Sequence, residues 1–173
     1  HAPGLASDTT FELQVFDAGG DALCDAWPLK TFPAPDAKAE RFRLAVYTCA
    51  GGSENVPMRG QDLWIPIAQR QRLLDRMLGF APDAVVGVGD QIYWDQITGV
   101  YKYINYPLPG LKAAIEAQWD QFGRFDRAKG ILGTSNESVL MRVCDDQLGD
   151  LYGTRLRSFP TILTQDDHDY FEN

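Results

Sequence analysis

Carboxylates, a phenol, a thiol and an imidazole occur in this chain at points where short apolar runs end. The stretch GVGDQIYWD places Asp90 directly after an apolar run and Tyr93 three residues later. The stretch TQDDHDYFEN surrounds His168 with acidic residues after a second apolar run, and Cys49 follows a third. These side chains bind hard or borderline metal ions, and the thiolate and phenol favour redox-capable iron.

These groups would meet only if a parallel sheet brought the ends of their strands together. The apolar segments 42–48, 84–88 and 161–164 are predicted strands. A helix beginning near Pro66 separates the first two, and a strand–helix–strand unit with continuously apolar strands predicts a parallel sheet. Because ligands bind beyond the carboxyl ends of strands in open α/β sheets, we expect one common site there.

Two further helices and one loop are expected in the second half of the chain. An apolar stripe opposed by charged residues predicts a helix beginning at Leu111 and extending towards Phe125. The same periodicity predicts a helix over 136–152, with Leu140, Val143, Leu148 and Leu151 facing inward. Before them, the Tyr- and Pro-rich stretch YKYINYPLPG, residues 101–110, is predicted to be a loop that contacts substrate.

The first part of the chain predicts a small separate unit. Two short strand-like stretches, TTFELQVFD and ALCDAWPLKTF, are joined by Gly19 and Gly20, and a Gly pair is typical of a hairpin turn. Pro33 and Pro35 then begin a linker. We therefore expect a β-hairpin and its linker over residues 1–38, and an α/β domain over residues 39–173.

Composition restricts the possible partners. The chain has 173 residues, a net charge of -8 and no apolar run long enough to cross a bilayer. This charge argues against a nucleic-acid groove, which needs clustered Lys and Arg. An anionic substrate would instead need bound cations to attract it. The odd number of cysteines does not form a closed disulfide framework, and core packing is expected for Cys24 and Cys144.

Structural interpretations compete with the metal-binding one at each position. A Gly-Asp pair is a common turn, which would explain Asp90. Cys49 could be a small buried apolar residue, and Tyr93 could pack its ring and hydrogen-bond its hydroxyl group. Asp167 could cap a helix, and His168 could be a structural imidazole. Their shared position at strand ends favours a metal site. The clustered carboxylates favour it too, because adjacent like charges repel unless they are solvated or bound to a metal ion.

At these residues the sequence resembles the alkaline phosphatase D (PhoD-like) branch of the calcineurin-like metallophosphoesterases. The resemblance lies in GDQIY, in a preceding strand ending in Thr-Cys, and in DDHD after a later strand. The stretch WPLKTFPAP followed by FRLAVYTCA is similar to that branch's junction between a fibronectin-like β-domain and its catalytic domain. The implied fold is α/β (α+β overall). Residues 39–173 would be the first half of a metallophosphoesterase domain, half of its β-sandwich flanked by helices. Residues 1–38 would be a remnant hairpin of a fibronectin-like β-sandwich domain and its linker.

The resemblance implies a two-metal phosphoesterase that cleaves phosphate monoesters or diesters. The metals would be iron plus calcium, or another divalent cation in place of calcium. His168 would lie beside the substrate phosphate and either stabilise developing charge or protonate the leaving oxygen, and Asp169 would orient that imidazole. The implied metal ligands are Cys49, Asp90, Tyr93 and Asp167.

The match is incomplete, because the family's site also needs several His ligands and this chain has only His1 and His168. We therefore expect a fragment of a longer protein, completed by further sequence or by a second chain, with weak metal binding and poor activity alone. The family favours a periplasmic or secreted location, although no signal segment is evident in residues 1–173. The alternative function is a non-catalytic metal-binding or structural α/β module.

Overall fold

The computed structural model describes residues 4–38, 40–94 and 110–170. Residues 101–109 of the predicted substrate loop therefore lie outside the described residues. The helices and strands are β1 (Thr10–Leu13), β2 (Trp27–Lys30), β3 (Leu44–Tyr47), β4 (Pro57–Met58), β5 (Gln61–Asp62), α1 (Ile67–Leu78), β6 (Ala84–Val88), α3 (Leu111–Phe122), α4 (Ser135–Cys144), a π-helical turn (Asp145–Gly149), α5 (Asp150–Tyr152), β7 (Thr161–Thr164) and a 3-10 turn (His168–Tyr170).

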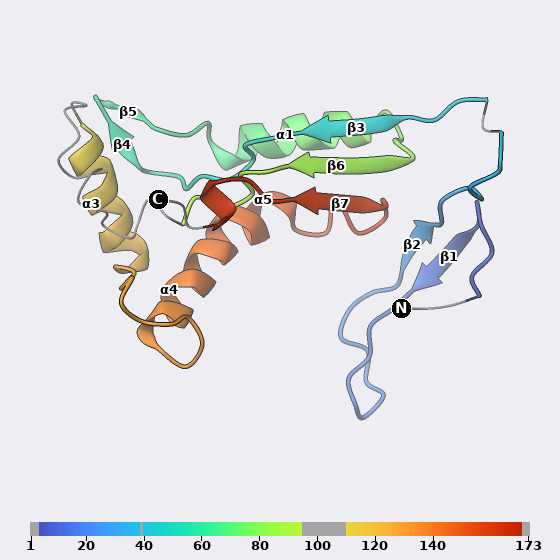
Figure 1. Ribbon diagram of the computed structural model, residues 1–173, viewed down its shortest axis with the longest axis horizontal. Helices are drawn as coiled ribbons and strands as arrows, with labels where there is room; N and C mark the ends of the chain where they lie inside the picture. The colour runs from blue at the N-terminus through green and yellow to red at the C-terminus, as the bar shows by residue number, and fades with distance from the viewer. Residues whose placement is uncertain (1–3, 39, 95–109, 171–173) are drawn as a thin grey trace.

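A three-stranded parallel sheet forms the centre of the molecule, with the strand order β3-β6-β7. The three arrows point the same way in Figure 1, so their carboxyl ends share one edge. Helix α1 connects β3 to β6 and begins directly after Pro66, as the sequence predicts. The predicted mixed α/β class with a parallel sheet is therefore confirmed.

Helices cover one face of this sheet. The Tyr47 hydroxyl on β3 donates a hydrogen bond over 2.9 Å to that of Tyr152 on α5. The Gln71 amide on α1 donates to the Asp150 carbonyl over 2.6 Å. Val85 of β6 is fully buried beneath these helices. The outer face of α1, with Gln69, Arg72 and Arg76, is exposed, while Leu74 on its inner face is buried.

The opposite face of the sheet is apolar and exposed within the described structure. The pairing register places alternate residues of the three strands on this face. Their exposed fractions are 53% for Leu44, 58% for Val46, 43% for Val88 and 51% for Ile162. Strands of an all-parallel sheet are normally covered on both faces, so only half of the expected burial is present here.

The helix expected over 136–152 is observed as one continuous helical segment with a π-helical turn in its middle. Helix α4 starts at Ser135, where the Thr134 side chain accepts a hydrogen bond from the Asn136 amide. The π-helical turn then leads directly into α5. Val143 and Leu151, both predicted to face inward, are buried. The sequence reasoning missed the π-helical turn and the short β4–β5 pair.

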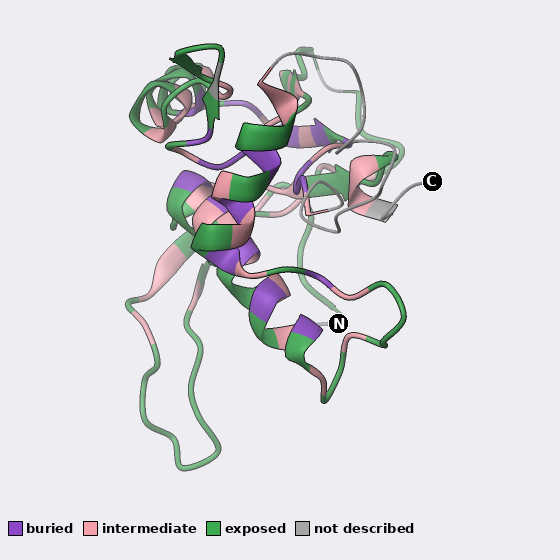
Figure 2. Cartoon of the chain, turned by 90° about the vertical axis from the view of Figure 1, so that its left-hand side faces the viewer, coloured by how far each residue is buried: buried purple, intermediate pink, exposed green. Residues whose placement is uncertain are grey.

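The main apolar core lies between α3, α4 and the loop that follows β6. Figure 2 shows buried residues on these helices. The predicted stripe of α3 faces this core, although the helix ends at Phe122 and Phe125 follows in the loop. The buried members of the cluster are Ile92, Phe122, Phe125, Val139 and Val143.

The predicted N-terminal hairpin is present and extends away from the sheet (Figure 1). Strands β1 and β2 pair antiparallel from Thr10–Lys30 to Leu13–Trp27. The turn forms because the Asp17 carboxylate accepts hydrogen bonds from the amides of Gly19 and Asp21, and Gly20 adopts a φ of 91°.

Candidate metal centre

The three loops that leave the carboxyl edge of the sheet start side by side. The Thr48 hydroxyl donates to the Val88 carbonyl over 2.5 Å, and the Cys49 amide donates to the Gly89 carbonyl over 3.4 Å. On the other side, the Gly89 amide donates to the Thr164 carbonyl over 3.2 Å. Gly89 therefore occupies the middle of this edge, directly before Asp90.

The backbone at this edge adopts conformations that non-glycine residues rarely take. Cys49 has a φ of 54° and Asp90 a φ of 52°, both in the left-handed region. Gly89 has a φ of 64°, and a Cβ atom there would lie 2.3 Å from the Cβ of Asp166. Strained residues of this kind persist only where the surroundings hold them, and they concentrate at functional sites.

The Asp90 carboxylate is the point where the predicted ligands converge. Its Oδ2 accepts hydrogen bonds from the Tyr93 hydroxyl over 3.1 Å and from the Cys49 thiol over 3.4 Å. Its Oδ1 is buried and has no hydrogen-bond partner among the described residues. Ligand atoms of Asp90, Asp167 and His168 all lie within 4.8 Å of one another.

Tyr93 is held between two rings and remains a neutral phenol. Its ring centroid lies 4.5 Å from that of Trp64 and 4.4 Å from that of His168. Burial, followed by the neighbouring Cys49 and Asp90, raises the pKa of Tyr93 well above its usual value. The phenol therefore donates a hydrogen bond to Asp90, and ligation of a cation would have to displace its proton.

Asp169 connects the loop after β7 to the loop after β6. Its Oδ1 accepts hydrogen bonds from the amides of Gln91 over 2.8 Å and Ile92 over 3.1 Å. Its Oδ2 accepts one from the Asp166 amide over 3.1 Å. The two bonds from Gln91 and Ile92 hold the loop that carries Asp90, and the bond from Asp166 lies within the loop after β7. The predicted role of Asp169 in orienting the His168 imidazole stays a prediction.

Two residues of this region were missed by the sequence reasoning, Trp64 and Gln147. A Cβ at Gly52 would lie 2.4 Å from the Trp64 ring, which therefore packs directly against the loop after β3. Gln147 lies in the π-helical turn and is 1% exposed. Its spacing of four from the predicted inward residues Val143 and Leu151 was the available signal, because it places a polar side chain on a buried helix face.

The donor set fits a metal ion. Two carboxylates, an imidazole, a thiol and a phenol suit iron or a divalent cation. The buried oxygen of Asp90 that lacks a partner supports this fit, because a buried polar atom is normally satisfied. The structure thus brings together five of the six predicted site residues: Cys49, Asp90, Tyr93, Asp167 and His168. The sixth, Asp169, lies behind them against the backbone.

A scan against protein-family models, a search of curated proteins and a search of solved structures each found no match to this chain. The description of the site therefore depends on its own residues and geometry. None of the helices in the described ranges is long and apolar enough to span a membrane.

Proposed function

We propose that this chain carries part of a two-metal centre that hydrolyses phosphate esters, on the fold of an alkaline phosphatase D type metallophosphoesterase. The observation that supports this most directly is the convergence of Cys49, Tyr93, Asp167 and His168 around Asp90. Each follows a strand of one parallel sheet, at the edge where such sheets bind ligands.

Bound metals would supply a hydroxide nucleophile near neutral pH and neutralise the phosphoryl charge. Asp90 would bridge the two metals, since one of its oxygens meets Cys49 and Tyr93 and the other is without a described partner. Cys49 and Tyr93 would hold the iron. Asp167, which is exposed, would hold the calcium or other divalent cation.

A role in proton transfer fits the surroundings of His168. It is partly exposed, stacks on Tyr93 and lies within the same 4.8 Å group as two carboxylates. The ring contact with Tyr93 would limit the orientations of this imidazole. We assign it the protonation of the leaving oxygen.

A second chain, or further sequence, would complete the remaining ligands. The apolar sheet face formed by Leu44, Val46, Val88 and Ile162 supports this, because an all-parallel sheet is normally covered on both faces. The chain alone is therefore expected to bind metal weakly and to turn substrate over slowly.

The competing function is a non-catalytic metal-binding module. The scarcity of imidazoles favours it, since the sequence contains only His1 and His168. In this case the site would hold a cation for structural reasons, with Asp90 still the central ligand.

Hydrolysis of p-nitrophenyl phosphate and bis(p-nitrophenyl) phosphate by the chain loaded with iron and calcium tests the proposal. We expect slow release of p-nitrophenol that Asp90→Asn abolishes and that the exposed control Asp120→Asn leaves unchanged. The ratio of the two rates gives the preference for monoesters or diesters. Metal binding without hydrolysis would favour the module, and absence of metal binding would overturn both functions.

A further inference from the structure

The Gln147 side chain joins the two loops that carry the predicted metal ligands. Its Oε1 accepts hydrogen bonds from the Gly52 amide over 3.1 Å and from the Tyr93 amide over 2.7 Å. Its Nε2 donates to the Ser53 hydroxyl over 3.0 Å. Gly52 lies three residues after Cys49, and Tyr93 lies three residues after Asp90. A single buried carboxamide therefore fixes equivalent points of both loops.

The packing around these bonds leaves the two loops little freedom. The Gly51 amide donates to the Asp90 carbonyl over 3.2 Å, and a Cβ at Gly51 would lie 2.7 Å from the Tyr93 ring. Any change in the separation of the loops would therefore move the Tyr93 phenol relative to Asp90 and Cys49. The amides of Gly52 and Tyr93 are buried, so they depend on Gln147 as their acceptor.

We propose that Gln147 is a positioning residue of the metal centre, which sets the distance between the Cys49 loop and the loop that carries Asp90 and Tyr93. Gln147 is not one of the predicted ligands, and it would act through the backbone of both loops. The proposal rests on the proposed function, because it assigns Gln147 a role in holding ligands for a cation. The π-helical turn that contains Gln147 agrees with it, since such turns are frequent at functional sites.

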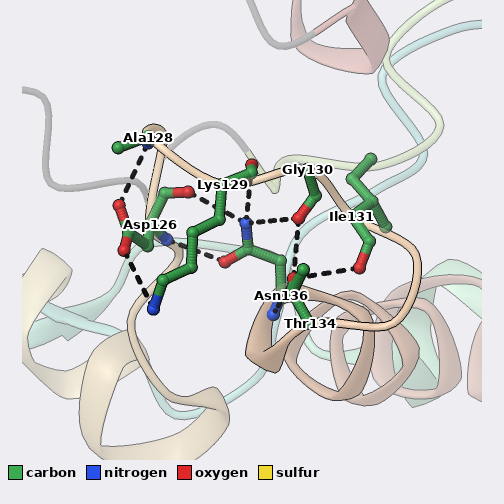
Figure 3. A network of polar contacts seen from close by, with 7 residues as sticks. All are labelled: Asp126, Ala128, Lys129, Gly130, Ile131, Thr134 and Asn136. Carbon is green, nitrogen blue, oxygen red and sulfur yellow. Dashed lines mark hydrogen bonds and ion pairs between the residues drawn. The ribbon is translucent and has the colours of Figure 1, made fainter.

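Asn136, on the same helical segment, offers a matched control. It too is a fully buried carboxamide, and its Oδ1 and Nδ2 hold the loop after α3, as Figure 3 shows. Its Nδ2 donates to the carbonyls of Asp126, Lys129 and Gly130 over 2.9 to 3.1 Å. Loss of this amide removes a comparable set of bonds from a loop that carries none of the predicted ligands.

Titration of the purified chain with Co²⁺, followed by the thiolate-to-cobalt absorption band, tests the proposal. Gln147→Met keeps the side-chain length but removes the amide, and we expect it to weaken Co²⁺ binding about 10- to 100-fold, as is typical when outer-shell partners are lost. Gln147→Glu retains an acceptor for both backbone amides and should recover most of the affinity. Asn136→Leu should lower the thermal midpoint while leaving the Co²⁺ affinity at the wild-type value.

The outcomes separate this inference from the proposed function. Equal Co²⁺ affinity of Gln147→Met and the wild type would overturn the positioning role and leave the metal centre intact. Equal losses of Co²⁺ affinity in Gln147→Met and Asn136→Leu would also overturn the positioning role, because both variants would then act through general stability. A wild-type chain that binds no Co²⁺ would overturn the metal centre and the positioning role together. If Gln147→Met does not fold, Gln147→Asn, which keeps the amide but is one methylene shorter, is judged by the same outcomes.

Discussion

The Tyr93 hydroxyl donates a hydrogen bond over 3.1 Å to Asp90 Oδ2, the same oxygen that accepts the Cys49 thiol over 3.4 Å. The turn that begins at Asp90 thus brings the phenol back to the carboxylate three residues earlier. Hydrogen bonds therefore join three of the predicted ligands directly. A metal entering this site would replace two protons, so its affinity should rise with pH.

Replacement of Tyr93 by Phe separates the phenol's contribution as a ligand from its contribution to packing. Because Phe keeps the ring contacts with Trp64 and His168, we expect a loss of only about 1–2 kcal/mol in the free energy of unfolding, from the missing hydrogen bond to a carboxylate. Iron-loaded wild type should show a visible tyrosinate-to-iron band that Tyr93→Phe lacks. An identical band in the variant would exclude Tyr93 as the iron ligand.

Replacement of Asp90 by Asn should affect metal binding far more than it affects folding. The amide has nearly the same shape, but it removes the charge that would bridge two cations. We expect a loss of at least about tenfold in Co²⁺ affinity, since outer-shell changes alone cost this much. Isothermal titration of wild type, Asp90→Asn and the exposed control Asp120→Asn measures the effect. Unchanged affinity in Asp90→Asn would place the metal elsewhere.

Gly89 should be among the positions least tolerant of a side chain. Gly89→Ala combines a φ of 64° with a Cβ only 2.3 Å from the Cβ of Asp166. Gly20→Ala is the matched control, because Gly20 also has a positive φ of 91° but a Cβ there would meet no described atom within 4 Å. We expect Gly20→Ala to lower the free energy of unfolding by about 1–2 kcal/mol, from backbone strain alone. Urea unfolding should show a clearly larger loss in the free energy of unfolding for Gly89→Ala. Equal losses in the two variants would contradict the close approach of Gly89 to the Asp166 side chain.

Asp146 should destabilise the folded chain in a pH-dependent way. Burial is the main cause that raises the pKa of Asp146 above its usual value, although Ser53 and Arg70 act in the opposite direction. Its Oδ2 is buried without a hydrogen-bond partner among the described residues. Because the pKa of Asp146 is raised in the folded state, its carboxyl does not destabilise the fold below the unfolded-state pKa, where it is protonated in both states. The destabilisation appears as the pH rises through the folded-state pKa.

Asp146→Asn should therefore stabilise the chain at neutral pH, by about 1 kcal/mol, because a half-buried carboxylate with one oxygen lacking a partner among the described residues is replaced by a neutral amide. The gain should vanish in acid, where the wild-type carboxyl is protonated in both states. Thermal unfolding of both proteins between pH 3 and pH 8 provides the measurement, with the exposed Asp120→Asn as the control. A gain that does not depend on pH would show that charge is not its cause.

The sequence predicted those features that depend on local pattern. The helix starting after Pro66, the apolar strand 84–88 and the turn at Gly19-Gly20 were all expected and are confirmed. Their periodicity and turn residues are encoded within a few neighbouring positions. Parallel pairing of the strands was also predictable, because a right-handed crossover leaves few alternatives.

The sequence alone determined which residues could bind a metal, since side-chain type and position after a strand are readable from the chain. Only the tertiary structure decided how they meet: Cys49 and Tyr93 on one oxygen of Asp90, with Asp169 turned to the backbone. It also added Gln147, whose bonding partners are 95 and 54 residues away. Hydrogen bonds over such separations follow from how helices pack on the sheet, and no local pattern specifies them.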